Sequence, residues 1–417
     1  MRHLIVGNGP AGVVATETLR KHAPADTITL LGNEPGPPYS RMAIPYLLMG
    51  NIEERGTWLR KDAGHFERLG IALKTGHARA LDTTAREVVL ESGEVLPWDR
   101  LLVATGSRPN RPPVPGIDLP GVHPCWTLED ARAIMARAAK GSRVLQMGAG
   151  FIGCIIMEAL AARGVHLTVV EMGDRMVPRM MTPGAGGLIK AWCERKGIRV
   201  ITGDRLQSIA QSGTALVATL QDGQAIEADL VISATGVAPN TAFLEGSGVA
   251  CDHGVLVDER METNVHGVYA AGDVSRAPEF DTGRKIAYAI QPTAVEQARI
   301  AALNMAGRHA EATGALAMNV LDTLGLVASS FGQWQGVPAT EGGESVEVRD
   351  DAAFRYLRLE FKGDRLVGAT SLGLTEHVGV IRGLIQGRVA LGEWKAKLLA
   401  DPTRLMDAYL ARAQAAA

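Results

Sequence analysis

Two stretches of the chain carry the same order of apolar, glycine-rich and charged positions. The first reads HLIVGNGPAGVVATETLRKH…TITLLGNE from His3, and the second reads RVLQMGAGFIGCIIMEALAARG…HLTVVEMGD from Arg143. Their first glycines, Gly7 and Gly148, are 141 residues apart. Each stretch is a short apolar run, a glycine-rich turn, a helical segment and a second apolar run that ends on an acid. This pattern predicts two βαβ units with parallel strands.

A second pair of similar segments follows these units. DRLLVATGSRPN (residues 99–110) and ADLVISATGVAPN (residues 228–240) are apolar strands that break at Ala-Thr-Gly and leave through a proline. Each is preceded by a segment typical of short strands joined by turns. We therefore expect two nucleotide-sized α/β modules, each with a Rossmann-like fold.

The pattern changes after Gly307. LVASSFGQWQG, FRYLRLEFKGDRLVGATSLG and HVGVIRGLIQGRVALGEWKAKLL predict a few antiparallel strands followed by helices, and FKGDR has the composition of a hairpin turn. The last of these segments is interpreted as a helix of a core or dimer interface, with a membrane-surface helix as the alternative. The predicted fold class is α/β, with two Rossmann-like domains and a small α+β C-terminal domain.

Composition narrows the class of protein. The length of 417 residues suggests two or three domains, and 46% apolar residues suffice for more than one core. A formal charge of −2 gives no reason to expect nucleic-acid binding, and no apolar run is long enough to span a membrane. The chain opens directly into a strand-like segment, which leaves no room for a signal peptide. These features predict a soluble, cytoplasmic protein.

Catalytic and metal-binding motifs are missing from the sequence. The four cysteines form no C-x-x-C pair, which argues against a disulfide framework, a cysteine-rich zinc site or a redox centre of neighbouring cysteines. The ten histidines are scattered, so we expect no metal site. There is no G-x-S-x-G, H-E-x-x-H or P-loop motif either.

The first glycine fingerprint has the spacing of a dinucleotide-binding turn. Gly7 permits the tight turn, Gly9 lets the backbone approach a pyrophosphate, and Gly12 lets the helix pack closely on the strand. The helix begins near Pro10 and Ala11, so its free N–H groups and positive end point at the phosphates. Proline suits this early position because its missing donor costs nothing there.

The second fingerprint repeats this spacing in Gly148, Gly150 and Gly153, with Phe151 and Ile152 at the start of its helix. One fingerprint alone is a weak signal, since glycine-rich turns also serve plain packing. Two fingerprints, each with a strand before it and a helix after it, favour a pair of dinucleotide sites.

An acid follows each fingerprint at the distance expected for a ribose-binding carboxylate. Glu34 lies 22 residues beyond Gly12, and the adjacent Asn33 is an alternative for the same role. In the second module, Glu171 would accept bonds from the adenosine ribose and repel a 2′-phosphate, which favours NADH over NADPH. Arg175, four positions on, is the residue that would hold a phosphate if this preference were reversed.

The chain resembles the two-dinucleotide-binding-domain flavoproteins, the pyridine nucleotide–disulfide oxidoreductase superfamily, from Met1 to about Gly307. Beyond the fingerprints, the resemblance includes ETNVHGVYAAGDV, whose Gly272 and Asp273 it places at the FAD ribityl chain and pyrophosphate. It also includes AIQPTAVEQARIAALNMAG, a helix whose start at Pro292 and Thr293 would face the pyrimidine edge of the flavin. A positive helix end there would stabilise the anionic reduced flavin.

The resemblance implies further cofactor contacts. Arg41, in PPYSRMAIPYLLMG, would reach the FAD phosphates, although a solvated surface arginine is an equal reading. Thr105 and Gly106 would close over FAD, and Ala78 would touch adenine through its backbone. Gly236 would close over the nicotinamide nucleotide.

The family organisation also assigns the modules. It implies a discontinuous FAD-binding domain of residues 1–115 and 241–315, an inserted NADH-binding domain of residues 116–240, and a C-terminal interface domain of residues 316–417.

Within this superfamily the chain most resembles rubredoxin and ferredoxin reductases and the N-terminal part of nitrite reductase large subunits. Two departures from other branches favour this placement, and a third, from the ferredoxin reductases themselves, counts against it. Disulfide reductases carry a C-x-x-x-x-C motif after the first helix, whereas no cysteine of this chain precedes Cys125. Met42 stands where water-forming NADH oxidases and coenzyme A–disulfide reductases carry a redox cysteine. A thioether cannot form the sulfenate or mixed disulfide that those reactions need. Pro45 and Ile155 stand where ferredoxin reductases carry a lysine and a glutamate, and Glu158 is not assumed to substitute.

The expected function is an FAD-dependent NADH oxidoreductase that passes electrons to a small carrier protein of the ferredoxin or rubredoxin type. The chemistry belongs to the cofactors, so no side chain is assigned as a catalytic group. One alternative is an NADH:quinone or small-acceptor reductase. The other is a flavin-binding interaction protein with incidental NADH turnover. The C-terminal domain would carry acceptor specificity and the contacts of any homodimer.

Overall fold

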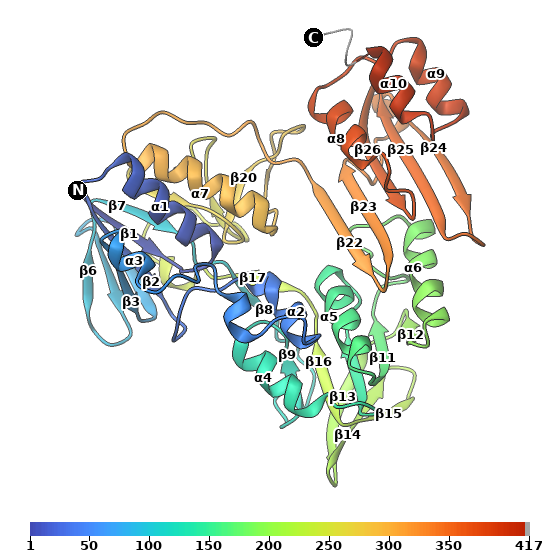
Figure 1. Cartoon of the computed structure of the whole chain (residues 1–417), viewed down its shortest axis with the longest axis horizontal. Coiled ribbons are helices and arrows are strands. Elements are labelled where there is room, and N and C mark those ends of the chain that lie inside the picture. Colours follow the sequence, from blue (N-terminus) through green and yellow to red (C-terminus); the bar gives the residue numbers. More distant parts are fainter. Residues whose placement is uncertain (413–417) are drawn as a thin grey trace. The chain divides into compact units, whose positions relative to one another are not determined.

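The computed structural model describes residues 1–412, and their contacts form two compact units (Figure 1). The first unit joins Met1–Asn110 to Val237–Ala315. The second joins Arg111–Gly236 to the chain from Leu316 onward. The expected division into three domains is finer than this grouping and stays a prediction. The C-terminal region therefore packs with the middle segment of the chain as one unit.

The first unit is built on a five-stranded parallel sheet with the order β19-β7-β1-β2-β3. Its strands, in chain order, are β1 (Arg2–Val6), β2 (Thr27–Gly32), β3 (Ile71–Thr75), β7 (Arg100–Val103) and β19 (Val268–Ala270). Helices α1 (Pro10–His22) and α7 (Gln291–Met305) pack against each other over this sheet (Figure 1). The apolar runs of the sequence become its interior, where Leu4, Ile5 and Leu30 are buried.

Shorter elements complete the first unit. The antiparallel meander β4 (Ala78–Asp82), β5 (Glu87–Leu90) and β6 (Val95–Pro97) packs into the same core as the sheet. Strand β8 (Ser107–Pro109) pairs with β17 (Val237–Pro239). The remaining elements are η1 (Arg41–Ala43), α2 (Ile44–Leu48), η2 (Glu54–Thr57), α3 (His65–Arg68), η3 (Ala242–Leu244), β18 (Val255–Leu256), β20 (Ser275–Pro278) and β21 (Lys285–Ile286).

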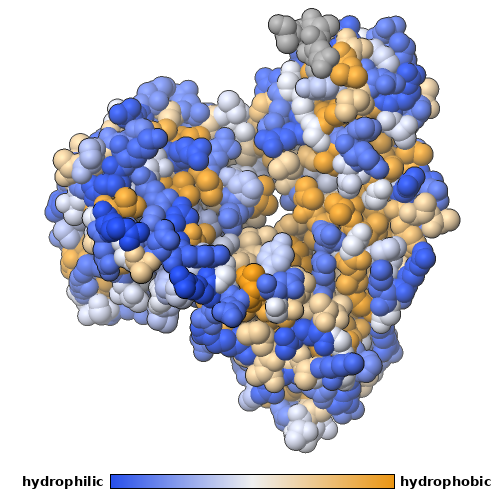
Figure 2. Space-filling model, viewed as in Figure 1, coloured by the Kyte–Doolittle hydropathy of each residue, from blue (hydrophilic) through white to orange (hydrophobic). Residues whose placement is uncertain are grey.

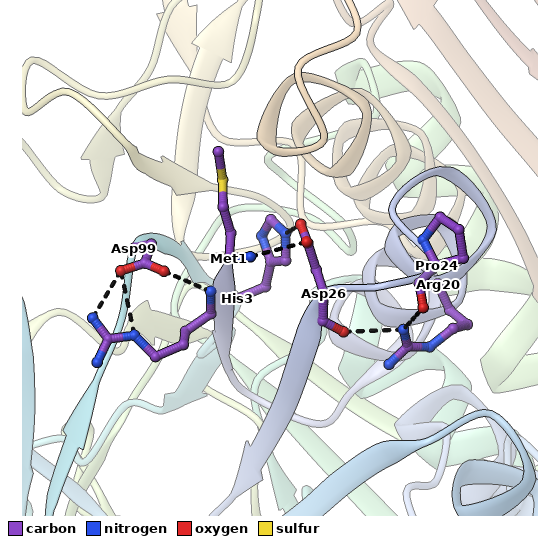
Figure 3. Close-up of polar contacts among 7 residues, drawn as sticks. Met1, His3, Arg20, Pro24, Asp26 and Asp99 are labelled. Atoms are coloured by element: carbon purple, nitrogen blue, oxygen red, sulfur yellow. Dashed lines mark hydrogen bonds and ion pairs between the residues drawn. The ribbon is translucent and has the colours of Figure 1, made fainter.

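A polar network closes the amino end of β1, at the opposite end of the strand from the glycine turn (Figure 3). The imidazole Nε2 of the buried His3 lies 2.8 Å from Oδ2 of Asp26, and the Met1 ammonium donates to the other oxygen at 2.9 Å. Arg20 donates to the backbone carbonyls of Pro24 and Asp26. These contacts fasten the end of α1 and the start of β2 to β1.

The second unit repeats the architecture of the first with a parallel sheet of order β12-β11-β10-β16-β9. Its strands are β9 (Val122–Pro124), β10 (Arg143–Met147), β11 (His166–Glu171), β12 (Arg199–Thr202) and β16 (Leu230–Ser233). The same unit contains the helices α4 (Leu128–Arg137), α5 (Phe151–Ala162) and α6 (Pro183–Arg195). It also contains an antiparallel meander of β13 (Leu206–Ser212), β14 (Ala215–Leu220) and β15 (Ala225–Ala228). The matching strand orders confirm two Rossmann-like modules.

The C-terminal region is an antiparallel sheet followed by helices, as predicted. The strands β22 (Met318–Thr323), β23 (Leu326–Gly332), β24 (Gly343–Asp350), β25 (Arg355–Lys362) and β26 (Arg365–Leu372) have the order β22-β23-β26-β25-β24. A short helix, η4 (Ala339–Glu341), precedes β24. The FKGDR segment forms the predicted hairpin, with Lys362 opposite Arg365.

Three helices end the described chain: α8 (Val378–Gln386), α9 (Glu393–Ala400) and α10 (Leu405–Arg412). The apolar side of α8, with Ile381, Leu384 and Ile385, is buried in the core of the C-terminal region. This burial favours the interpretation of the segment as a core helix over a membrane-surface helix. Within residues 1–412, none of the helices has the length and apolar character needed to cross a bilayer.

Candidate dinucleotide-binding sites

The first glycine turn has one position that faces open space. A Cβ atom on Gly7, whose φ is +116°, would lie 2.0 Å from the carbonyl oxygen of Ala104. A Cβ on Gly12 would lie 1.8 Å from the carbonyl oxygen of Gly7. A Cβ on Gly9 would meet nothing within 4 Å. Gly7 and Gly12 are therefore required by packing, whereas Gly9 leaves the backbone accessible to a ligand.

The second glycine turn has the same stereochemistry. Gly148, with φ +100°, is closed by the carbonyl of Ala234 at 2.5 Å from an added Cβ, and Gly153 is closed by the carbonyl of Gly148 at the same distance. A Cβ on Gly150 would meet nothing within 4 Å. This open middle position of each turn is the space that a pyrophosphate needs at a helix N-terminus.

Helix starts meet both turns as the sequence predicted. Helix α1 begins at Pro10 and Ala11, and α5 begins at Phe151 and Ile152. Their N-cap residues are glycines that provide no side-chain hydrogen bond. The first N–H groups of each helix are thus not capped by the preceding side chain, which suits an anionic ligand.

The acid after the first turn is held by an arginine and a tyrosine. Oε1 of Glu34 accepts from Nη2 of Arg41 at 2.7 Å, and Oε2 accepts from the Tyr39 hydroxyl at 2.6 Å. Arg41 is therefore paired with Glu34 and is not a freely solvated arginine. Asn33 is exposed, so the geometry favours Glu34 over it as the ribose-binding residue.

Asp273 follows Gly272 and is bound by the side chain of Ser107. Its Oδ2 accepts from the Ser107 hydroxyl at 2.9 Å, while burial raises the pKa of this carboxyl and the charge of Arg41 lowers it. Gly272 has a φ of +81°, and a Cβ added to it would lie 3.3 Å from Cβ of Ala294 and 3.5 Å from Cβ of Ala11. The backbone at 272–273 therefore lies between the starts of α1 and α7.

The other predicted FAD residues come from three further segments of the first unit. Pro292 and Thr293 form the first turn of α7. The Thr105 hydroxyl donates to the carbonyl of Asn240 at 2.8 Å, and Gly106 follows with φ +64°. Ala78 begins β4. Sequence reasoning missed Ser107, which is the next residue after the Ala-Thr-Gly segment.

The acid after the second turn is held by backbone amides alone. Oε2 of Glu171 accepts from the N–H of Ala149 at 2.7 Å, and Oε1 accepts from the N–H of Gly173 at 2.8 Å. Arg175 donates to Asp174 and to the carbonyls of Met181 and Pro178. Its guanidinium is thus engaged within its own loop. Gly236 follows β16 with φ +94°.

Ile155, one of the two predicted replacements, belongs to a surface of apolar side chains. Ile155 lies half-buried on α5 together with Phe151 and Ile152, and Val320 of β22 is 51% exposed. Figure 2 shows apolar side chains gathered over α5 and β22. Burial and Asp322 raise the pKa of Glu158, which places that carboxyl beside the turn between β22 and β23.

The cysteines are placed as buried apolar residues, with one exception. Cys125, Cys154 and Cys193 are buried, and burial raises the pKa of each thiol, to about 12 for Cys125 and Cys193. Cys251 is exposed. Met42 in η1 is 49% exposed, and Pro45 is buried in α2. Among residues 1–412, no group of three or more histidine, cysteine or acidic side chains is arranged to hold a metal.

Known proteins match this chain along nearly its whole length. It is 33% identical over 405 residues to the epsilon subunit of NADH-dependent phenylglyoxylate dehydrogenase from Aromatoleum evansii, covering 96% of this chain and 95% of that one. It is 32% identical over 309 residues to rhodocoxin reductase from Rhodococcus erythropolis, covering 74% and 72% of the two chains. The fold matches putidaredoxin reductase in its complex with putidaredoxin, with a TM-score of 0.89, 23% identity and 98% of both chains covered.

The family model for pyridine nucleotide-disulphide oxidoreductases matches residues 1–302, which contain both glycine turns and the Gly272–Asp273 segment. The chain therefore belongs to the pyridine nucleotide–disulphide oxidoreductase family, whose members are flavin oxidoreductases that use FAD and NAD(P)H.

Proposed function

We propose that this chain is an FAD-dependent NADH oxidoreductase that passes electrons to a small carrier protein of the ferredoxin or rubredoxin type. The observation that carries the proposal is the pair of glycine turns, each open only at its middle glycine, Gly9 or Gly150. The similarity to rhodocoxin reductase supports the type of acceptor. When bound, FAD and NADH supply the hydride and electron transfers themselves.

The residues of the first unit would bind and orient FAD. The start of α1 and Gly9 would receive the pyrophosphate, with Arg41 supplying a positive charge. Glu34 would exchange one of its present partners, Arg41 or Tyr39, for a ribose hydroxyl. Asp273 would accept a hydrogen bond from a ribityl hydroxyl. The start of α7 would place its positive end near the flavin.

The residues of the second unit would bind NADH in preference to NADPH. Glu171 lies at the end of β11 with both carboxylate oxygens on backbone amides, and a 2′-phosphate beside it would meet a negative charge. Arg175 is bound to Asp174 and to two carbonyls of its own loop, which leaves its guanidinium less available to that phosphate.

We also propose that no cysteine takes part in the reaction. A thiol must ionise to attack or to become oxidised, and burial raises the pKa of Cys125, Cys154 and Cys193. The exposed Cys251 lies 98 residues after Gly153, the last glycine of the second turn. Met42 cannot form a sulfenate or a disulfide.

A second candidate function follows from the end-to-end match with a subunit. The epsilon subunit of the phenylglyoxylate dehydrogenase aligns with 96% of this chain, C-terminal region included. On this reading the chain is the NADH-linked flavoprotein subunit of a larger oxidoreductase, and its electron partner is another subunit. Co-purification of a stable complex from the native source would favour this candidate, and a chain that purifies alone and reduces a free carrier would favour the first.

The decisive experiment mixes the purified protein anaerobically with NADH or NADPH and follows the flavin absorbance, then adds ferredoxins and rubredoxins. We expect a yellow protein that NADH bleaches faster than NADPH, and a carrier that restores the oxidised spectrum. A protein that stays colourless after reconstitution with FAD would refute the proposal.

A further inference from the structure

The loop of residues 172–182, which follows Glu171, is fastened to the second glycine turn at a single residue, Ala149. The N–H of Ala149 donates to Oε2 of Glu171, and its carbonyl accepts from the N–H of Val177 at 2.9 Å. Val177 is buried and has a φ of +50°, which is a strained conformation for a β-branched residue. Such strain persists only where neighbouring contacts hold the backbone in place.

The contacts that hold Val177 come from the last residues of the same loop. Its carbonyl accepts from the N–H groups of Met180 and Met181, both at 3.0 Å. The carbonyl of Met181 accepts from Nε of Arg175 at 3.1 Å. The loop is therefore a closed set of hydrogen bonds whose geometry depends on where Met181 is fixed.

Met181 is followed by Thr182, the N-cap of α6, and Thr182 is bound by the C-terminal region. Its Oγ1 donates to the hydroxyl of Tyr356 at 2.7 Å and accepts from the N–H of Ala185. Tyr356 in turn donates to Oε2 of Glu347 at 2.7 Å. A Cβ on Gly184 would lie 2.8 Å from the Tyr356 ring, so the first turn of α6 is closely packed on it.

The Tyr356 hydroxyl is held on the side of the C-terminal region as well. Tyr356 is fully buried, and Glu347, its acceptor, also pairs with Arg358 at 3.4 Å. Arg358 is bound to the buried Glu360 at 2.6 Å. Because the acceptor is fixed by two further charged groups, the hydroxyl acts as a rigid link between β25 and the loop.

We infer that Tyr356 is a positioning residue for the dinucleotide: through Thr182, its hydroxyl keeps the loop of residues 172–182 in the conformation that holds Glu171 and Val177 on Ala149. The C-terminal region then sets how tightly and how selectively the second unit binds NADH. This inference rests on the proposed function for the identity of the ligand, but the link from Tyr356 to Ala149 lies entirely in contacts of the second unit.

A second tether between the same two regions provides a matched control. Nε1 of Trp192, on α6, donates to the carbonyls of Thr323 and Leu324 at 3.1 and 3.3 Å. This contact joins α6 to the turn between β22 and β23 and has no hydrogen bond to the loop. Trp192→Phe therefore removes an inter-region hydrogen bond of the same kind as Tyr356→Phe without touching the loop.

The test compares Tyr356→Phe, Thr182→Val, Thr182→Ser and Trp192→Phe in the purified flavoprotein. Anaerobic rapid mixing with increasing concentrations of NADH or NADPH gives both the Kd of each nucleotide and the limiting rate of flavin reduction. We expect Tyr356→Phe and Thr182→Val to raise the Kd for NADH about threefold to tenfold, as loss of one hydrogen bond implies. The limiting rate should stay within about twofold, since no reacting group changes, and Thr182→Ser should bind NADH as the unaltered protein does.

Hydrogen exchange at the amides of Ala149 and Val177 provides a readout independent of NADH. These amides should exchange faster in Tyr356→Phe and Thr182→Val and at the original rate in Thr182→Ser and Trp192→Phe. The inference is overturned if exchange at both amides is unchanged in Tyr356→Phe, or if Trp192→Phe shifts exchange and Kd equally. If the exchange pattern is as expected but NADH never reduces the flavin, the positioning link stands and the proposed function fails.

Discussion

The two glycine turns share their backbone geometry but differ in how the following acid is held. In both turns the outer glycines are closed by a carbonyl and the middle glycine is open. In the first unit, Glu34 is bound by the side chains of Arg41 and Tyr39. In the second unit, Glu171 is bound by the N–H groups of Ala149 and Gly173.

This difference suits a ligand that stays in one site and comes and goes in the other. In the proposed FAD site, the charge of Arg41 would add an electrostatic contact to the phosphates, which favours lasting binding. Backbone amides position the carboxylate of Glu171 without bringing a positive charge to the site, so a dinucleotide is selected at the ribose but is not held by an ion pair. The shared geometry fits the proposed pair of dinucleotides, and the different partners of the two acids predict that FAD dissociates more slowly than NADH.

The largest expected effect is on folding, at the closed glycines. Gly7→Ala and Gly148→Ala each force a Cβ into a carbonyl oxygen and a positive φ on alanine, and we expect each to destabilise its unit by about 2–4 kcal/mol. Gly7→Ala should have the larger effect because its Cβ would lie 2.0 Å and not 2.5 Å from the oxygen. Thermal unfolding and flavin content measure this, with flavin lost in Gly7→Ala and retained in Gly148→Ala.

Controls for this prediction come from turns without a clash. Gly93 and Gly223 have φ values of +86° and +89°, and a Cβ on either would meet nothing within 4 Å. Alanine at these positions isolates the cost of the positive φ, about 1 kcal/mol. If Gly7→Ala is no more destabilising than Gly93→Ala, the predicted clash between a Cβ at position 7 and the carbonyl of Ala104 is contradicted.

The next effect is on binding, at the open glycines. Gly9→Ala and Gly150→Ala keep a φ of −73° that alanine adopts freely, so the melting temperature should stay nearly unchanged. The methyl group would project into the space for a pyrophosphate. We expect Gly9→Ala to lower flavin affinity and Gly150→Ala to raise the Kd for NADH, each about tenfold, or 1.4 kcal/mol. Titration with FAD and NADH gives both values.

The matched control for Gly150→Ala is Gly187→Ala on α6, where a Cβ also meets nothing within 4 Å. Alanine there favours the helix and should leave NADH binding as it is. Equal Kd values for the Gly150 and Gly187 variants would show that the second turn does not receive the dinucleotide.

A smaller effect is expected at the two acids. Glu171→Ala should weaken the binding of NADH about fivefold and the binding of NADPH less, because the lost carboxylate would both bind a ribose and repel a 2′-phosphate. Glu34→Ala should lower FAD affinity and leave the ratio of kcat/KM for NADH to kcat/KM for NADPH unchanged. Steady-state kcat/KM for NADH and NADPH measures the ratio. An equal loss for both nucleotides in Glu171→Ala would contradict the assignment of that residue.

The sequence predicted the parts of the molecule that local spacing determines. The glycine turns, the helices that begin at them and the parallel strand pairs follow from residues within about thirty positions of one another, as the fingerprints require. Side-chain partners from distant segments could not be predicted in this way. Ser107 and Asp273 are 166 positions apart, and Thr182 and Tyr356 are 174 apart. Such pairs depend on tertiary packing, which the spacing of residues within a single sequence does not reveal.

The amino ends of the two central strands extend the comparison, because they share one contact and differ in the next residue. Arg2 binds Asp99 through its backbone N–H and its guanidinium, and Arg143 binds Asp229 in the same way. The residue that follows is the buried His3 in the first unit, whereas it is Val144 in the second. His3→Val makes the two strands alike at this position.

The smallest expected effect is therefore on the pH dependence of stability. Burial lowers the pKa of His3, against the opposing pull of Asp26. The unfolded chain, with an ordinary histidine pKa near 6.5, then binds more protons than the folded chain below that pH, so stability is lost as the pH falls from about 6.5 through the lowered pKa. His3→Val should reduce this loss by about 1 kcal/mol or less, measured as the difference in free energy of unfolding between pH 7.5 and 5.5. Burial also lowers the pKa of His123, so the variant should retain part of the pH dependence. A variant that loses as much stability on acidification as the unaltered protein would show that His3 takes up its proton without unfolding, with Asp26 outweighing burial.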